Sequence, residues 1–158
     1  MSASAEAGAH AARRARLAAQ LQEAGGGAPI GLERSSSNLF RDRDEAPKRR
    51  LDLREFRHLL DVDAAAGWLD VEGSATYEDL VAAALPRGVM PAVVPQLKTI
   101  TVGGAAAGVG IEATSFRHGL VHDTLLELDV LLPDGRIVLC TPENEHRDLF
   151  FGFPNSYG

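Results

Sequence analysis

A glycine- and alanine-rich run over Thr101–Ala113 constrains this chain more than any other stretch of its sequence. Four glycines and four alanines stand in these thirteen residues, and the run begins within the β-branched stretch Thr99–Val102. Glycine adopts positive φ at little steric cost and has no Cβ to hold a ligand away from the backbone. Such a run can direct its N–H groups at an anion, as phosphate-binding nests do. It therefore predicts a loop that cradles the pyrophosphate of a nucleotide cofactor.

Two named nucleotide-binding motifs and one alternative without a ligand can be tested on this run. A P-loop requires a Lys-Ser/Thr pair after its last glycine, but Val109 follows Gly108 here. Gly108–Ala113 fits the G-x-G-x-x-A dinucleotide fingerprint with Asp129 at a suitable distance. That acid, however, lies inside a predicted hairpin rather than at the end of a parallel strand. The alternative is an apolar turn that only lets two elements pack closely, and it stays open.

Length, cysteine content and charge limit the classes of protein to consider. With 158 residues, 45% of them apolar, the chain is long enough for one domain with a hydrophobic core. The single cysteine, Cys140, excludes a disulfide framework and favours a reducing compartment, so we expect a cytoplasmic protein and leave peripheral membrane association open. No apolar run has the length of a transmembrane segment. Residues 61–158 hold five basic and fourteen acidic residues, which argues against nucleic acid as a partner.

The first 29 residues are expected to stand apart from the main domain. Residues 1–24 are rich in alanine and predict a helix that ends at Gly25–Gly27. Three arginines and few acids resemble a transit peptide, but we favour a solvated leading helix followed by a glycine-rich linker. A secretory signal is excluded because the segment lacks an apolar core.

Between this helix and the glycine-rich run, the pattern predicts three strands, a loop and one helix. Ile30–Arg34 alternates as a short strand and leads into Ser35–Asn38, a polar turn whose groups can donate to phosphate oxygens. The charged segment Arg41–Arg50 predicts an exposed loop. Two further strands are expected over Leu59–Val62 and Trp68–Glu72.

The clearest helix signal of the chain follows these strands. Thr76 is a good N-cap residue, and Asp79 stands at the capping-box position. Pro86 and Gly88 are expected to end the helix. The residues from Val89 to Gln96 contain two prolines and predict an extended connector into the glycine-rich run.

A hairpin and a short helix are predicted after the glycine-rich run. Its strands cover about Leu125–Leu132 and Arg136–Thr141, and the helix covers Glu145–Phe151. Four apolar residues of the first strand are expected to share one covered face: Leu126, Leu128, Val130 and Leu132.

No metal-binding or hydrolytic set of residues is predicted. His118 and His122 have a spacing that can ligate a metal from a helix, but Gly119 lies between them and a third ligand is missing. Cys140 lies in a strand pattern, which favours packing over nucleophilic chemistry. We therefore assign no metal ligand and no catalytic residue.

The order of these segments resembles flavoproteins with a PCMH-type FAD-binding domain, and most closely the sterol delta-24 reductase group that includes 24-dehydrocholesterol reductase and the Dwarf1/Diminuto proteins. The resemblance covers about residues 30–158. It is carried by Val71–Gly73, Thr76–Leu80, Met90–Pro95, Thr101–Ala113, Ser115–Leu120, Leu132–Gly135, Cys140–Pro142 and Asp148–Phe150.

The resemblance implies an α+β fold, vanillyl-alcohol-oxidase-like, in which two subdomains clasp FAD. It implies residues 30–158 as the FAD-binding domain, incomplete at its end and without the substrate domain. Family members continue beyond the Ser-Tyr-Gly motif with further FAD-contacting residues, so we expect a fragment with little turnover of its own. The FAD-contacting residues implied here are Thr101, Val102, Gly103, Gly104, Ala105, Ala106, Ala107, Gly108, Val109, Gly110, Ile111, Glu112 and Ala113, with Ser36, Ser37 and Asn38 in a first pyrophosphate loop.

By the same resemblance, the parent reaction is the NADPH-dependent reduction of a carbon–carbon double bond in a sterol-like side chain. FAD is expected to be bound non-covalently, because Ser35–Asn38 lacks the histidine through which some relatives attach it. Two alternatives stay open. One is an FAD-dependent oxidase or dehydrogenase of an alcohol or hydroxy acid, and the other is a truncated, non-catalytic nucleotide-binding module.

Overall fold

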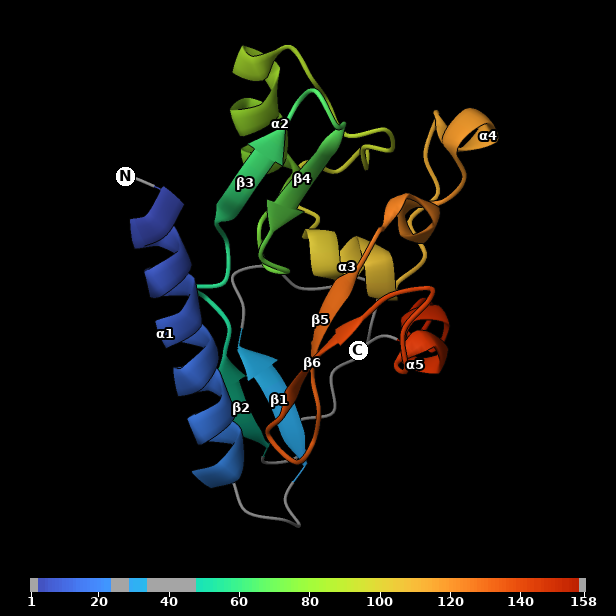
Figure 1. The fold of residues 1–158 in the computed structure, drawn as a ribbon. Coiled ribbons are helices and arrows are strands. Elements are labelled where there is room, and N and C mark those ends of the chain that lie inside the picture. Colours follow the sequence, from blue (N-terminus) through green and yellow to red (C-terminus); the bar gives the residue numbers. More distant parts are fainter. Residues whose placement is uncertain (1–2, 24–28, 34–47, 157–158) are drawn as a thin grey trace.

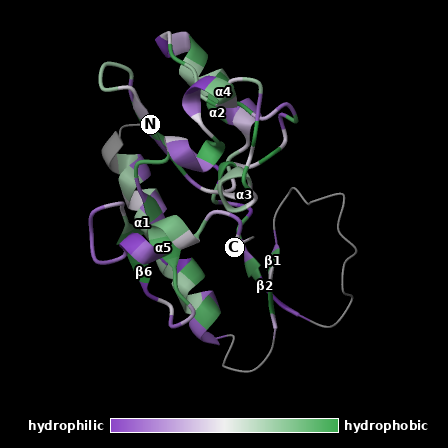
Figure 2. Ribbon diagram, turned by 90° about the vertical axis from the view of Figure 1, so that its right-hand side faces the viewer, coloured by the Kyte–Doolittle hydropathy of each residue, from purple (hydrophilic) through white to green (hydrophobic). Residues whose placement is uncertain are grey.

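The N-terminal segment forms a long helix that packs on the rest of the chain. The computed structural model describes residues 3–23, 29–33 and 48–156, and in it helix α1 spans Ala3–Glu23. The predicted helix is confirmed, but the expectation that it is solvated is wrong: Arg13 and Leu17 are each only 7% exposed. Their face lies against the neighbouring strands (Figure 1). Figure 2 shows hydrophilic and hydrophobic residues mixed along α1, as expected of a helix with one covered face.

A parallel strand pair lies beside this helix. Strand β1, Ile30–Glu33, pairs with β2, Arg49–Asp52, in the register Ile30↔Arg49 to Glu33↔Asp52. The first strand was predicted, but the loop expected through Arg50 is wrong at its end. Arg49 and Arg50 belong to β2, because pairing with β1 satisfies their backbone and Leu51 is buried beside them. Residues 34–47, with the predicted turn Ser35–Asn38, lie outside the described part of the chain.

An antiparallel hairpin and a capped helix follow, as predicted. Strands β3, Leu59–Asp63, and β4, Trp68–Val71, pair across a tight turn. Helix α2, Tyr77–Ala84, begins at Thr76, whose Oγ1 accepts the Asp79 N–H at 3.2 Å. It ends through a 3₁₀ turn, η1, Leu85–Arg87, at Gly88, whose φ of 74° closes the helix.

The core joins this helix to the glycine-rich run. Helix α3, Val102–Ala107, and a 3₁₀ turn, η2, Val121–Thr124, pack under α2, and helix α4, Ser115–His118, connects them (Figure 1). The buried residues of this cluster are Tyr77, Leu80, Val93, Ala105 and Val121. The glycine-rich run is therefore part of the packed interior at its N-terminal half.

A second antiparallel pair and a terminal helix complete the described fold. Strands β5, Leu128–Leu131, and β6, Ile137–Cys140, confirm the predicted hairpin, and helix α5, Arg147–Gly152, confirms the helix after it. The first strand is shorter than expected. Leu126 precedes it and is 66% exposed, so it does not share a covered face with the other apolar residues. Cys140 is fully buried, and burial raises the pKa of its thiol, with the charge of Asp129 adding to the shift.

A buried carboxylate attaches α1 to the β3–β4 hairpin. The Glu72 side chain is fully buried, and its Oε1 accepts hydrogen bonds from His10 Nδ1 and from Arg13 Nε, both at 2.7 Å. Its Oε2 accepts from the His58 backbone N–H at 3.0 Å and from His58 Nδ1 at 2.8 Å. Burial raises the pKa of Glu72, but the hydrogen bonds from His10, His58 and Arg13 outweigh it, so the pKa lies below its ordinary value.

This lowered pKa predicts an acid-sensitive contribution to stability. The ionised Glu72 stabilises the fold above the ordinary carboxyl pKa of 4.5, and the contribution is lost as the pH falls through the lower folded-state pKa. Because Glu72→Gln removes the titrating group, the difference in free energy of unfolding between parent and variant should shrink as the pH is lowered from about 7 to below 4.5. Urea titrations across that range measure it. A difference that grows on acidification would contradict the prediction.

Candidate functional site

The glycine-rich run forms a short helix followed by an irregular segment. The run was predicted to be a loop, and this is wrong for Val102–Ala107, which form α3. The reason is local: the Thr101 Oγ1 caps the helix by accepting the Gly104 N–H at 3.1 Å, and the three alanines favour helix. Residues 108–113 remain non-helical. The predicted site residues Thr101–Ala113 thus lie in two different backbone environments.

The glycines of α3 allow the chain to approach itself closely. The Gly103 N–H donates to the Gly73 carbonyl oxygen at 2.8 Å, and a Cβ placed on Gly103 would lie 2.9 Å from that oxygen. A Cβ on Gly110 would lie 2.8 Å from Val121 Cγ2. The packing alternative raised by the sequence therefore accounts for these two glycines, whatever the run binds.

The helix ends in a turn with an unusual residue at its key position. The Gly110 N–H donates to the Ala105 carbonyl at 3.0 Å and the Gly108 N–H to the Gly104 carbonyl at 2.9 Å. Val109 between them has a φ of 56°. This left-handed position at a helix end is normally occupied by glycine, and a β-branched residue is strained there.

Three N–H groups after α3 are available to a ligand. Among the described residues, no hydrogen-bond acceptor faces the N–H of Val109, Ile111 or Ala113, whereas those of Gly110 and Glu112 are satisfied. Backbone N–H groups without an acceptor in the chain are donors suited to phosphate oxygens. On this observation the segment fits the pyrophosphate of a dinucleotide such as FAD.

The one acid of the run is held by polar groups of its own chain. The Glu112 Oε2 accepts the Gln96 N–H at 3.2 Å, and the Glu112 N–H donates to Ser115 Oγ at 2.9 Å. Tyr77 lies near this charge: burial, and then the charge of Glu112, raise the pKa of the Tyr77 hydroxyl to about 12. Tyr77 therefore stays neutral beneath the segment at physiological pH.

The other predicted site residues cannot be placed beside this segment. Ser36, Ser37 and Asn38 lie outside the described residues. Gly73, on which α3 rests, was part of the Val71–Gly73 match but was not predicted as a site residue. The signal available for it was the Glu72–Gly73 pair at the end of a predicted strand, which by itself names no partner.

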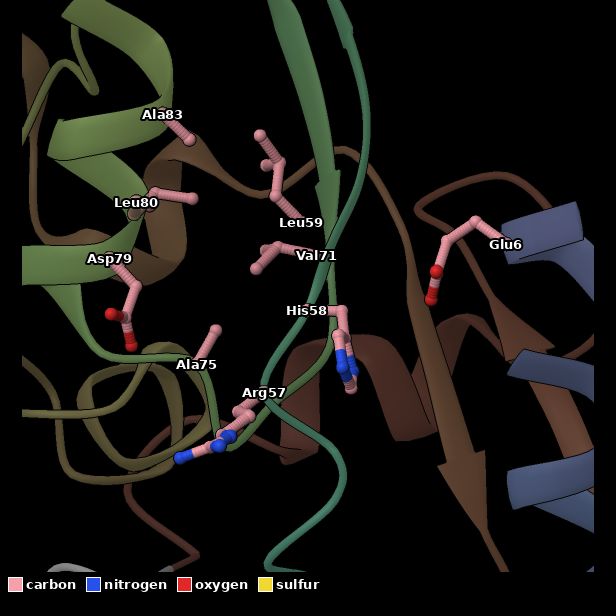
Figure 3. Close-up of a pocket in the computed structure, with 9 residues that line it drawn as sticks. All are labelled: Glu6, Arg57, His58, Leu59, Val71, Ala75, Asp79, Leu80 and Ala83. Atoms are coloured by element: carbon pink, nitrogen blue, oxygen red, sulfur yellow. The ribbon is translucent and has the colours of Figure 1, made fainter. Parts of the chain in front are cut away.

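A cavity of about 540 Å³ lies away from the glycine-rich run, between α1, the β3–β4 hairpin and α2. Figure 3 shows the side chains of Leu59, Val71 and Leu80 on its apolar side, with Arg57 and Asp79 at its edge. None of the run's residues is among the described residues that line it. It is therefore separate from the candidate pyrophosphate segment.

No helix in the described ranges has the length and apolar character needed to cross a bilayer.

Comparison with solved structures shows the fold. The chain matches 6-hydroxy-D-nicotine oxidase from Arthrobacter nicotinovorans with a TM-score of 0.75 and 20% identity, over 89% of this chain and 30% of that one. It matches a VAO-type flavoprotein from Myceliophthora thermophila with a TM-score of 0.73 and 20% identity, over 89% and 27%. The predicted α+β, vanillyl-alcohol-oxidase-like fold is confirmed.

The curated sequence relatives include delta(24)-sterol reductases and cytokinin dehydrogenases. The chain is 37% identical over 108 residues to the delta(24)-sterol reductase of Pisum sativum, which covers 68% of this chain and 19% of that protein. It is 36% identical over 100 residues to the human delta(24)-sterol reductase, covering 63% and 19%. It is 34% identical over 101 residues to cytokinin dehydrogenase 10 of Oryza sativa, covering 64% and 18%. The chain thus spans about a fifth of the length of the curated relatives it matches.

A family model described as an FAD binding domain matches residues 34–141, which include the glycine-rich run and both hairpins. The relatives and the solved structures agree with that match, and the resemblance expected from the order of the sequence motifs is confirmed. This chain belongs to the FAD-binding domain family of the PCMH-type flavoprotein oxidoreductases.

Proposed function

We propose that residues 109–113 hold the pyrophosphate of a non-covalently bound FAD, and that the chain is the flavin-holding part of a reductase of carbon–carbon double bonds in sterol-like side chains. NADPH is the proposed electron donor. The cofactor assignment is carried by the N–H donors of Val109, Ile111 and Ala113, which have no acceptor in the described part of the chain. The 37% identity to a delta(24)-sterol reductase supports the reaction class.

The residues of the segment have distinct parts in this proposal. FAD, when bound, supplies hydride transfer, and the protein supplies position and electrostatics. Val109, Ile111 and Ala113 offer donors to phosphate oxygens, while α3 fixes where the segment begins. The φ of 56° at Val109 is strained for a β-branched residue. Such strain is found mainly at functional sites, where the surrounding structure holds it in place, so it supports a functional role for this segment. Thr101–Gly108 position the segment more than they contact the cofactor.

A second candidate function is favoured by the cytokinin dehydrogenase relatives at 34% identity. In that case the same flavin-binding part would serve a dehydrogenase. The two candidates differ in electron flow: a reductase consumes NADPH, whereas a dehydrogenase passes electrons to an external acceptor. Supplying FAD-loaded protein with NADPH and a sterol bearing a side-chain double bond, or with a substrate and a redox dye, separates them.

Titration of the amide resonances tests the cofactor assignment. We expect FAD and ADP, which both carry a diphosphate, to shift the N–H signals of Val109, Ile111 and Ala113, because the diphosphate is the group these donors would bind. Riboflavin lacks the diphosphate and should leave the three signals in place. The N–H of Ala105, already bonded to the Thr101 carbonyl, is the internal control. Equal shifts with riboflavin, or none with FAD, would contradict the assignment.

A further inference from the structure

We propose that helix α1 braces the candidate flavin-binding segment, and that Glu72 is the positioning residue that connects the helix to it. The inference rests on the proposed function, because the segment it positions is Thr101–Ala113. Helix α1 covers residues 3–23, whereas the family model matches residues 34–141, so the family match by itself assigns the helix no part in the site.

The two oxygens of Glu72 face two different parts of the chain. Within the described residues, Oε1 accepts from α1, through His10 and Arg13, and Oε2 accepts from His58, just before β3. A buried carboxylate is tolerated where its lone pairs are satisfied. The carboxylate therefore links the position of α1 to that of the chain segment that carries Glu72.

That segment is the support on which α3 begins. Directly after Glu72, the Gly73 carbonyl accepts the Gly103 N–H at 2.8 Å, and the Ala75 carbonyl accepts the Val102 N–H at 2.9 Å. Gly103 has no room for a Cβ against Gly73, so the two backbones are in van der Waals contact. A displacement of the segment after Glu72 would move α3, and with it the start of residues 108–113.

Helix α1 has a second attachment on the other hairpin. Arg14, the residue after Arg13, forms an ion pair with Asp129 of β5 at 3.0 Å. The Gln22 side chain lies beside Gly135 in the β5–β6 turn, 3.0 Å from where a Cβ would stand. Neighbouring helix residues point about 100° apart, so the two arginines can reach different partners. One helix thus contacts both hairpins of the described fold (Figure 1).

The experiment compares two variants that each disturb one carboxylate facing α1. Glu72→Gln replaces one acceptor oxygen by an NH₂ group, which is a donor. The groups that donated to that oxygen then face another donor in a buried position. Glu55→Gln weakens the ion pair between Arg16 and Glu55, whose side chains are 58% and 69% exposed. His10→Ala, which removes one of the four hydrogen bonds to Glu72, serves if Glu72→Gln fails to fold.

Two readouts are taken on the full chain, at a temperature where far-ultraviolet circular dichroism shows every variant folded. Hydrogen exchange without FAD should be about tenfold faster at the hydrogen-bonded amides among residues 102–110 in Glu72→Gln, and unchanged in Glu55→Gln. FAD affinity should weaken as well, to the extent that the binding-competent conformation of the segment becomes less populated. His10→Ala should show the same pattern with a smaller change.

The outcomes separate this proposal from the proposed function. Unchanged exchange at residues 102–110 in both Glu72→Gln and His10→Ala would overturn the brace, even if the variants melt at a lower temperature. Equal acceleration in Glu55→Gln would also overturn it, because any loosening of α1 would then suffice. Failure of the parent chain to bind FAD would overturn the proposed function instead, while the exchange data still decide whether Glu72 positions the segment.

Discussion

Replacing Arg13 with alanine is expected to lower the free energy of unfolding by about 3–5 kcal/mol, the loss typical of breaking a buried ion pair. Arg13 is 7% exposed and donates to Glu72 at 2.7 Å and to Glu6 at 2.6 Å. Without Arg13, the Glu72 carboxylate remains buried and desolvated but has lost the guanidinium group that balances its charge. Urea unfolding followed by far-ultraviolet circular dichroism at neutral pH measures the loss.

Arg16→Ala is the matched control on the same helix. Arg16 pairs with Glu55 at 2.7 Å, but its side chain is 58% exposed and that of Glu55 is 69% exposed. Exposed pairs contribute at most about 1 kcal/mol, so this variant should stay close to the parent. Equal losses for Arg13→Ala and Arg16→Ala would mean that burial of the ion pair does not matter, contrary to the structure.

Gly103→Ala is expected to cost about 1–3 kcal/mol of stability, as overpacking in a filled core does. The new Cβ would lie 2.9 Å from the Gly73 carbonyl oxygen and 3.3 Å from the Gly73 Cα. Both are backbone atoms that have no rotamer to yield, so α3 must move away from its support. Because α3 leads into residues 108–113, FAD affinity should fall with stability. Thermal melts with and without FAD measure both effects.

Gly8→Ala provides the control of opposite sign. Gly8 lies in α1, and a Cβ there would meet nothing within 4 Å. Alanine is the better helix former by about 0.5–1 kcal/mol, so this variant should be more stable than the parent. A similar loss in both variants would show that the substitutions act through helix propensity or the unfolded chain rather than through contact with Gly73.

Local chemistry was sufficient to predict several elements of this fold. The Thr76 cap with Asp79 three residues later identified α2, and the apolar patterns over Leu59–Val62 and Trp68–Glu72 identified the two strands of the first hairpin. In each case the residues that cause the structure lie within one turn or one hairpin. The order of such segments, taken together, then predicted the flavoprotein fold that the comparisons confirm.

Interactions between distant residues were beyond this kind of inference. His10 and Arg13 meet Glu72 across 62 and 59 residues of chain, and no local pattern marks them as partners. The docking of α1 was missed for that reason. Strand β2 was missed similarly, because Arg49 and Arg50 have the composition of a loop and become a strand only by pairing with β1.

The candidate site falls between these two cases. The glycine-rich run was recognised as special, but glycines that allow contact with a ligand and glycines that allow contact with the chain itself look alike in sequence. Gly103 and Gly110 belong to the second kind. The left-handed Val109 could not be predicted either, since valine is an unfavourable residue for that conformation. The left-handed conformation of Val109 is recognised only in the structure, where this residue follows the end of α3.

Chemical labelling of the buried Cys140 thiol can measure local opening of the native chain. Cys140 is the single cysteine of the sequence, it lies at the last residue of β6, and burial raises its pKa. The thiolate is the form that attacks thiol reagents, so a closed strand is protected twice, by lack of access and by lack of ionisation. The labelling rate under native conditions therefore reports how readily the β5–β6 hairpin opens. Comparing the labelling rates with and without FAD gives the free-energy coupling between FAD binding and opening of this hairpin, which lies outside the glycine-rich run.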